Sequence, residues 1–147
     1  MRITILGAGN IGLAAGTKWK AKGHDITFGV RDPQSQKAWN AINIGAKVTT
    51  FQESMTGAEV VLVAIPFGVA DEVLKSIDVE WDGKIIIDAT NPISVSTEPF
   101  ESAAEAISAW TGSADVVKAF NTTGVGNMTN PEYNGKAIET FICGDEV

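Results

Sequence analysis

The chain has 147 residues, and its 18 Asp and Glu outnumber its 11 Lys and Arg, which gives a net charge of -7. This length is typical of one domain and excludes a second full-sized one, while the acidic balance argues against nucleic acid or an anionic membrane as a partner. One cysteine excludes an internal disulfide and a multi-cysteine metal site, and without a leader-like segment or an apolar run near ~18 residues we expect a cytoplasmic protein.

Apolar runs alternate with amphipathic stretches from the first residue to the last. The apolar runs predict strands at 2–6, 25–30, 47–51, 59–65, 84–88, 116–120 and 138–143. The stretches between them predict helices at 11–22, 33–44, 68–77 and 98–110, with a helical turn around residue 53. Strands that alternate with helices favour an α/β domain with a doubly wound, mostly parallel sheet between two helical layers, the Rossmann arrangement. We expect one such NAD(P)-binding domain over residues 1–147.

A glycine pattern follows the first predicted strand and opens the first predicted helix. Gly7-Ala8-Gly9-Asn10-Ile11-Gly12 has the form G-x-G-x-x-G in the strand–turn–helix context that this motif requires. Gly7 permits the tight turn, Gly9 lets the backbone approach a pyrophosphate, and Gly12 lets helix and strand pack closely. The helix N-terminus supplies unpaired N–H donors for the phosphates. The sequence therefore predicts dinucleotide binding.

The residues after the second predicted strand bear on the choice of dinucleotide. Arg31 is the first side chain past the strand and suits the 2′-phosphate of NADP, whereas an acid at this place would accept the ribose hydroxyls of NAD. We interpret Asp32-Pro33 as the N-cap and first residue of the next helix, not as an NAD-type acid. Lys37 is a possible second cation. NADP is favoured, and NAD stays open.

Polar residues also follow two later strands, but no convincing acid–base pair or metal site accompanies them. Asn91, before Pro92, could aim its amide into the ligand crevice, or it could simply form a turn. Asn121 and Thr122 end the next predicted strand and offer short polar groups to a carboxamide or a phosphate.

Four other residue types look structural, and we assign no catalytic residue. His24 is interpreted as a turn residue away from the ligand edge, and Cys143 as a small buried residue in the last strand. Lys118 should face a helix edge and not act as a Schiff-base lysine. The four tryptophans should pack against the sheet.

The segments GAGNIG, FGVRDP, VAIPF, IIDATNP and VVKAFNT occur in an order and spacing that resemble a known family over the whole chain. The chain is similar to the NADPH-dependent coenzyme F420 reductases, which are F420H2:NADP oxidoreductases and their relatives. The resemblance implies that residues 8–11 surround the pyrophosphate and that Arg31 holds the 2′-phosphate. It further implies that Pro66 and Phe67 flank the cofactor. The floor under the nicotinamide would come from Asn91-Pro92 and Asn121-Thr122.

Three positions depart from the family pattern. Val30 stands where the F420-linked enzymes typically carry a serine, Ser35 takes the place of a helix lysine, and Phe67 replaces a common tryptophan. The first two changes leave Arg31 as the main anchor of the phosphate pocket.

The last four residues, Gly144-Asp145-Glu146-Val147, look like the entrance to another helix. The resembling family continues from this point into a segment that completes the substrate cleft and the dimer interface. We therefore expect a fragment, a truncated product or a minimal nucleotide-binding version, in which an exposed sheet edge favours homo-oligomers.

Three functions are compatible with these features. The first is an NADP(H)-binding oxidoreductase domain that moves a hydride to or from a deazaflavin such as F420, a flavin or a similar planar acceptor. The second is an NADP-dependent dehydrogenase or imine reductase of the β-hydroxyacid and pyrroline-carboxylate type, which needs an acid–base residue from elsewhere. The third is a non-catalytic NADP(H)-binding, redox-sensing module.

Overall fold

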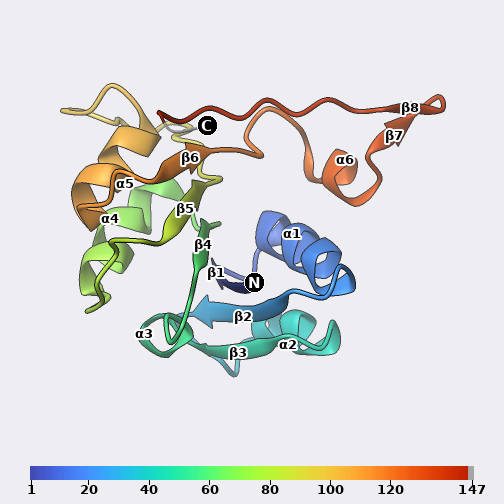
Figure 1. Cartoon of the computed structure of the whole chain (residues 1–147), viewed down its shortest axis with the longest axis horizontal. Coiled ribbons are helices and arrows are strands. Elements are labelled where there is room, and N and C mark those ends of the chain that lie inside the picture. Colours follow the sequence, from blue (N-terminus) through green and yellow to red (C-terminus); the bar gives the residue numbers. More distant parts are fainter. Residues whose placement is uncertain (146–147) are drawn as a thin grey trace.

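A six-stranded parallel sheet forms the centre of the computed structural model, which describes residues 1–145 (Figure 1). The strands follow the order β3-β2-β1-β4-β5-β6, which is the Rossmann order with its topological switch between β1 and β4. Their bounds are β1 (Arg2–Leu6), β2 (Asp25–Val30), β3 (Lys47–Thr50), β4 (Val60–Val63), β5 (Ile85–Asp88) and β6 (Val116–Lys118). The predicted doubly wound α/β fold is therefore confirmed.

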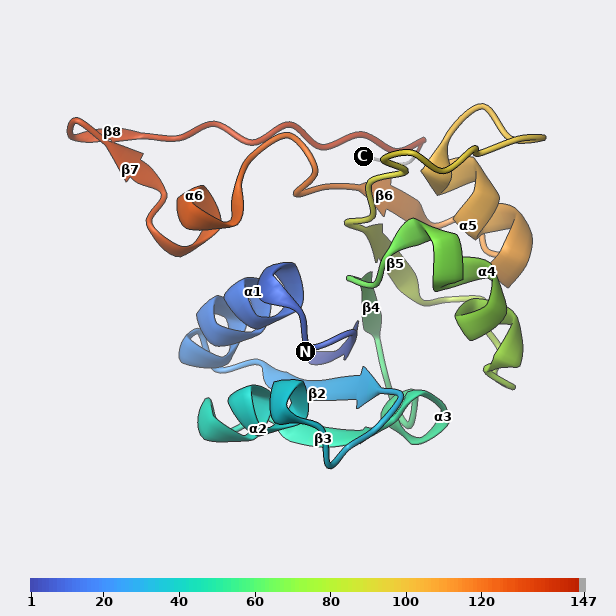
Figure 2. The same cartoon turned by 180° about the vertical axis from the view of Figure 1, so that it is seen from behind.

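Helices cover both faces of this sheet, and the two views from opposite sides agree on their placement (Figures 1 and 2). The helices are α1 (Asn10–Ala21), α2 (Gln36–Asn43), α3 (Phe51–Ser54), α4 (Phe67–Ser76), α5 (Ala103–Thr111) and α6 (Val125–Thr129). Helices α1, α2 and α6 lie on one side and α4 and α5 on the other. Among residues 1–145, no helix has the length and apolarity that crossing a bilayer requires.

Two large clusters of buried side chains, one on each face, hold the layers together, and a smaller third cluster contains Phe67, Ala103 and Ala106. One cluster joins β1 and β2 to α1 and α2 around Ile5 and Phe28, and the other joins β4 and β5 to α4 and α5 around Leu74 and Ile107. All four residues of β4 are buried, because helices cover both of its faces. Such a strand has to be apolar throughout, as its sequence predicted.

The start of α2 differs from the prediction. The helix begins at Gln36, and Ser35 is its N-cap, with the Ser35 hydroxyl accepting a hydrogen bond from the Ala38 N–H. The interpretation of Asp32 as the N-cap is wrong, because its carboxylate instead accepts from the Gln34 N–H two residues on, at 2.9 Å. This local turn consumes the residues that were expected to form the first helical turn.

The segment after β6 departs most from the prediction. The expected strand 138–143 is wrong: the chain forms α6, then a short hairpin of β7 (Glu132–Tyr133) and β8 (Lys136–Ala137), and returns to β6 as a single antiparallel bridge between Lys118 and Cys143. Without a helical crossover, the returning chain cannot join the sheet in parallel.

Two burial expectations fail, because no part of residues 1–145 covers the side chains concerned. Cys143 is exposed and not buried as expected, because the strand that was to bury it does not form. Trp39, on the outer face of α2, is 57% exposed and does not pack against the sheet. The predicted helix entrance at 144–147 extends over residues 146 and 147, which lie outside the described residues.

Candidate functional site

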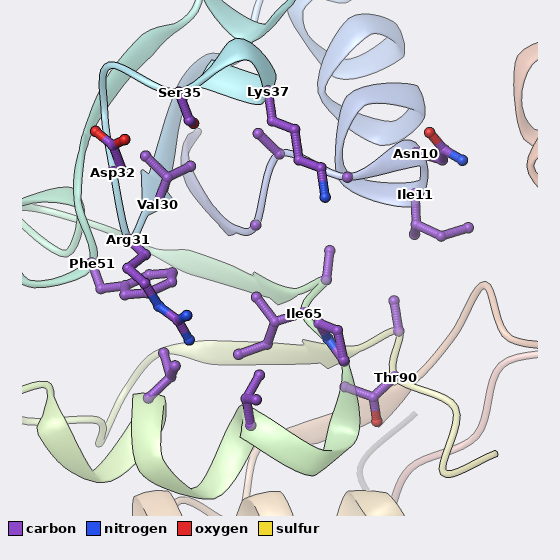
Figure 3. A pocket seen from close by; sticks show the side chains of 18 of the residues that line it. Asn10, Ile11, Val30, Arg31, Asp32, Ser35, Lys37, Phe51, Ile65 and Thr90 are labelled. Atoms are coloured by element: carbon purple, nitrogen blue, oxygen red, sulfur yellow. The ribbon is translucent and has the colours of Figure 1, made fainter. Parts of the chain in front are cut away.

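A cavity of about 660 Å³ opens at the carboxyl ends of β1, β2, β4 and β5, which is where ligands bind in doubly wound sheets (Figure 3). Its walls come from the loops and helices that follow these strands. The lining residues are Gly7, Ala8, Gly9, Asn10, Ile11, Val30, Arg31, Asp32, Ser35, Lys37, Phe51, Ala64, Ile65, Pro66, Val69, Val73, Ala89, Thr90 and Asn91.

The three motif glycines between β1 and α1 are required for different reasons. Gly7 has a φ of +104°, and a Cβ there would lie 2.6 Å from the Ala64 carbonyl oxygen. A Cβ on Gly12 would lie 2.2 Å from the Gly7 carbonyl oxygen, so helix and strand can approach only with glycine there. A Cβ on Gly9 would meet nothing within 4 Å. The protein itself therefore needs Gly7 and Gly12, whereas the space beside Gly9 belongs to the cavity.

The N-terminus of α1 faces this space, and no other residue among 1–145 accepts from the backbone N–H groups of its first turn. Its N-cap, Gly9, has no side chain to cap the helix, and its first turn contains no acidic residue. Asn10 and Ile11, the first two helical residues, line the cavity. The unpaired N–H groups and the positive end of the helix dipole suit an anion.

Two cations reach the cavity from the β2–α2 side. Arg31 and Lys37 both line it, and Figure 3 shows the Lys37 ammonium extending into its interior. Among the described residues, Asp32 is the one acid on the lining, but its carboxylate points away from the Arg31 side chain and is bound to the Gln34 N–H. In a chain of net charge -7, this end of the cavity is locally favourable for a phosphate.

Apolar side chains that the sequence analysis did not single out form the wall between the two ends. Ile65 follows β4, Val69 and Val73 lie one turn apart on α4, and Phe51 begins α3 beside Arg31. Val69 and Val73 are four residues apart, which is the spacing of one helical face, and this periodicity is the signal that could have identified their part of the wall.

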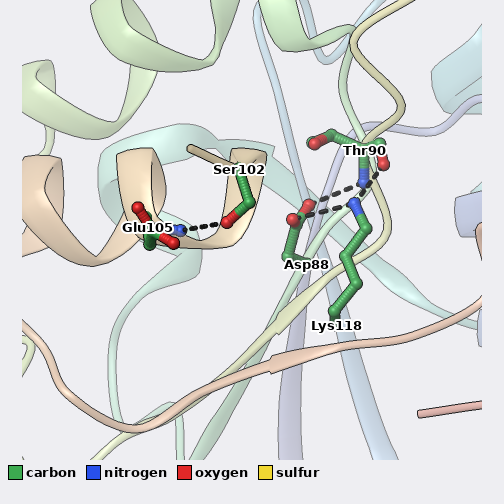
Figure 4. Close-up of polar contacts among 5 residues, drawn as sticks. All are labelled: Asp88, Thr90, Ser102, Glu105 and Lys118. Carbon is green, nitrogen blue, oxygen red and sulfur yellow. Dashed lines mark hydrogen bonds and ion pairs between the residues drawn. The ribbon is translucent and has the colours of Figure 1, made fainter. Parts of the chain in front are cut away.

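At the opposite end of the cavity, a buried ion pair joins the ends of β5 and β6 (Figure 4). The Lys118 ammonium lies 2.9 Å from the carboxylate of Asp88, which is fully buried, and also donates to the Thr90 carbonyl. The other Asp88 oxygen accepts from the Thr90 N–H at 2.7 Å. The expectation that Lys118 faces a helix edge is therefore wrong. An acid in the apolar strand IIID needs a buried partner, and that was the available signal.

The structure brings part of the predicted site together and leaves part of it outside. Gly7, Ala8, Gly9, Asn10, Ile11, Arg31, Pro66 and Asn91 line the cavity. Gly12 lies beneath it, in the contact between α1 and β1. Phe67 is buried against Trp110, with 5.4 Å between the ring centroids. Pro92, Asn121 and Thr122 are not among the lining residues.

The amino ends of the strands carry a separate polar contact, remote from the cavity. The Arg2 backbone N–H donates to the Glu59 carboxylate at 2.8 Å, and this bond, with the nearby Arg2 charge, lowers the pKa of Glu59. His24 lies in the turn between α1 and β2, next to this edge, as expected of a structural residue.

This fold, with a glycine turn and a helix N-terminus at the switch point of the sheet, defines a Rossmann-type domain of the dinucleotide-binding class. The chain belongs to the family described as NADP oxidoreductase coenzyme F420-dependent, whose model matches residues 2–92. It is thus a member of an NADP-dependent oxidoreductase family, as the order of its motifs predicted.

Two solved structures resemble this chain in fold over most of its length. A candidate F420-dependent NADP reductase from Arthrobacter sp. FB24 has 25% identity and a TM-score of 0.79, over 99% of this chain and 74% of that chain. A reductive aminase from Aspergillus terreus, solved with NADPH, has 20% identity and a TM-score of 0.62, over 80% and 39% of the two chains.

A curated relative is much longer than this chain. Metalloreductase STEAP3 of Rattus norvegicus is 27% identical over 147 residues, which are 99% of this chain and 29% of the relative. The chain thus spans under a third of that protein.

Proposed function

We propose that residues 1–147 form an NADP(H)-binding domain that orients NADPH for hydride transfer to a planar acceptor of the deazaflavin or flavin type. Bound NADPH would supply the hydride, and the residues of this chain would bind and orient the dinucleotide. Residues 8–11 would contact the pyrophosphate, Arg31 the 2′-phosphate, and Pro66 and Asn91 the nicotinamide half.

The observation that carries the choice of NADP is the opposite orientation of Arg31 and Asp32. Arg31 lines the cavity, and within residues 1–145 its guanidinium has no ion-pair partner, so it can bind a phosphate through two hydrogen bonds. Asp32 would be the acid for an unphosphorylated ribose, but its carboxylate is bound to the Gln34 N–H and points away. The Lys37 ammonium adds a second positive charge at the same end.

The position of the titratable groups supports a planar hydride acceptor. Among the described lining residues, the titratable ones are Arg31, Asp32 and Lys37, and all three lie at the β2–α2 end. No described lining residue at the end near Thr90 is an acid or a base. Reduction of a carbonyl or an imine needs a proton donor, whereas transfer between two stacked rings depends mainly on their orientation. This favours the deazaflavin or flavin acceptor over the dehydrogenase and imine reductase alternatives.

The cofactor assignment is tested by titrating the purified chain with NADPH and NADH in a calorimeter. We expect NADPH to bind at least about tenfold more tightly, because only NADPH offers Arg31 a phosphate. Equal affinities, or no binding of either, would contradict the assignment.

The acceptor is tested separately, by mixing the NADPH complex with oxidised F420, FMN or a cyclic imine and following the nicotinamide absorbance. We expect oxidation of NADPH with one of the first two and none with the imine. Oxidation by the imine alone would contradict the proposed acceptor class. Tight NADPH binding without oxidation by any of the three would support the non-catalytic alternative.

A further inference from the structure

The Asp88–Lys118 ion pair binds both polar backbone groups of one residue. The Thr90 N–H donates to one oxygen of Asp88, and the Thr90 carbonyl accepts from the Lys118 ammonium. The second Asp88 oxygen joins the two charged groups (Figure 4). Two successive peptide planes, 89–90 and 90–91, are therefore fixed in direction by one buried unit.

Peptide planarity determines what these two planes present on their other sides. In a trans peptide the C=O and the N–H point in opposite directions. Because the Thr90 N–H points to Asp88, the Ala89 carbonyl points away from Asp88, and because the Thr90 carbonyl points to Lys118, the Asn91 N–H points away from Lys118. Within residues 1–145, neither the Ala89 carbonyl nor the Asn91 N–H forms a hydrogen bond. Both residues line the cavity.

This pair of free groups lies at one particular end of the cavity. Figure 3 shows Thr90 at the opposite end from Arg31. If Arg31 holds the phosphate on the adenosine, the other end of the same dinucleotide reaches residues 89–91. The nicotinamide carries a carboxamide, with an NH₂ donor and a carbonyl acceptor, and these groups complement a free carbonyl and a free N–H.

Packing alone does not explain an ion pair here. Apolar side chains of similar volume often hold two strand ends at least as well as a buried ion pair, because two charges must be desolvated. Apolar side chains could not, however, fix the direction of a peptide group. The hydrogen bonds to Thr90 are thus a property that the charged pair provides and apolar side chains do not.

We propose that Asp88 and Lys118 are positioning residues, which hold the Ala89 carbonyl and the Asn91 N–H in place to bind the nicotinamide carboxamide. This rests on the proposed NADP function. It assigns nicotinamide recognition to backbone groups and their orientation to a buried ion pair.

The contact can be tested first on the unmodified chain with three probes. These are NADP⁺, its 3-acetylpyridine analogue, which lacks the amide NH₂, and 2′,5′-ADP, which lacks the nicotinamide half. We expect the analogue to bind about tenfold more weakly than NADP⁺, since the Ala89 carbonyl loses its donor. Equal affinities for NADP⁺ and the analogue would overturn the proposal.

The positioning role is tested with Lys118→Met, and Lys75→Met serves as the matched control. Lys75 pairs with Asp71 on the exposed face of α4, in the last turn of that helix, and is not among the residues that line the cavity. We expect Lys118→Met to bind NADP⁺ about tenfold more weakly, to lose its preference over the analogue, and to keep its 2′,5′-ADP affinity within about twofold. Lys75→Met should match the unmodified chain with all three probes.

Two results would contradict the positioning role. One is a folded Lys118→Met variant that still prefers NADP⁺ over the analogue, and the other is a parallel loss of NADP⁺ and 2′,5′-ADP affinity. If Lys118→Met does not fold, the double variant Asp88→Asn, Lys118→Met replaces it, because it leaves no unpaired buried charge. Failure of the unmodified chain to bind 2′,5′-ADP would instead contradict the proposed NADP function.

Discussion

At the β2–α2 end of the cavity the polar groups belong to the exposed side chains of Arg31 and Lys37, whereas at the β5–β6 end they belong to backbone fixed by a buried ion pair. Exposed side chains can be exchanged with little effect on folding. A buried ion pair cannot lose one partner without leaving a charge in the core. Substitutions at Arg31 or Lys37 are therefore expected to leave the fold intact, whereas a substitution in the ion pair is expected to affect the fold as well.

The largest expected effect comes from the glycine turn that separates the two ends. Gly12→Ala would place a Cβ 2.2 Å from the Gly7 carbonyl oxygen and should cost about 3 kcal/mol of stability, since backbone would have to move. Gly9→Ala is the matched control, since its Cβ meets only open space and should cost less than about 1 kcal/mol. Urea unfolding measures both. A Gly9→Ala variant as unstable as Gly12→Ala would contradict this reading of the turn.

The second prediction concerns Arg31, at the β2–α2 end of the cavity. Arg31→Ala should weaken NADPH binding by roughly thirtyfold, or about 2 kcal/mol, leave NADH binding unchanged, and shift stability by less than about 0.5 kcal/mol. Calorimetric titration and thermal unfolding of the same sample measure these quantities. If the NADH affinity fell in parallel, Arg31 would not be specific for the 2′-phosphate.

A smaller effect is expected from the second cation at that end. Lys37 lies in the first turn of α2, where the helix dipole disfavours a positive charge. Lys37→Gln should therefore raise the stability by about 0.3 kcal/mol while it weakens NADPH binding by about threefold. Chemical denaturation measures the expected gain in stability, and titration with NADPH measures the expected loss of affinity. Unchanged NADPH affinity would leave Arg31 as the only cation that matters.

The smallest effect is expected at the amino ends of the strands, which lie at neither end of the cavity. The pKa of Glu59 is lowered by the Arg2 N–H, so the carboxylate stabilises the folded chain at neutral pH. That stability is fully present above the ordinary value of 4.5 and is lost as the pH falls through the lowered pKa. A Glu59→Gln variant should melt slightly lower than the unmodified chain at pH 7 and coincide with it in acid. A difference that persists in acid would rule out this linkage.

The sequence predicted the first part of the fold well, because the signals there are local. The strands at 2–6 and 25–30 match β1 and β2, each an apolar run that ends at the expected turn. The run 138–143 has the same apolar character, but Phe141 and Ile142 are 72% and 58% exposed. Whether such a run forms a strand depends on a partner in space, which residue pattern alone does not specify.

The same distinction separates the predicted from the unpredicted parts of the site. The motif glycines and Arg31 were identifiable because one short loop or strand end sets their position. The Lys118–Asp88 pair joins residues 30 positions apart, and the direction of the Thr90 peptide groups follows from that contact. No local pattern encodes such a direction, although the acid at the end of an apolar strand indicated that a partner had to exist.

Because Arg31 is exposed and the Asp88–Lys118 pair is not, the two ends of the cavity should respond differently to ionic strength. At 0.1 M salt, dissolved ions largely screen the interactions of an exposed guanidinium with charges more than about 10 Å away. They screen a pair in the protein interior much less. If Arg31 binds the adenosine phosphate as proposed, adding salt should weaken that attraction while leaving the orientation of the residue 89–91 backbone unchanged. The discrimination between the two dinucleotides then becomes a property of the solution as well as of the sequence, and it is sharpest in dilute buffer.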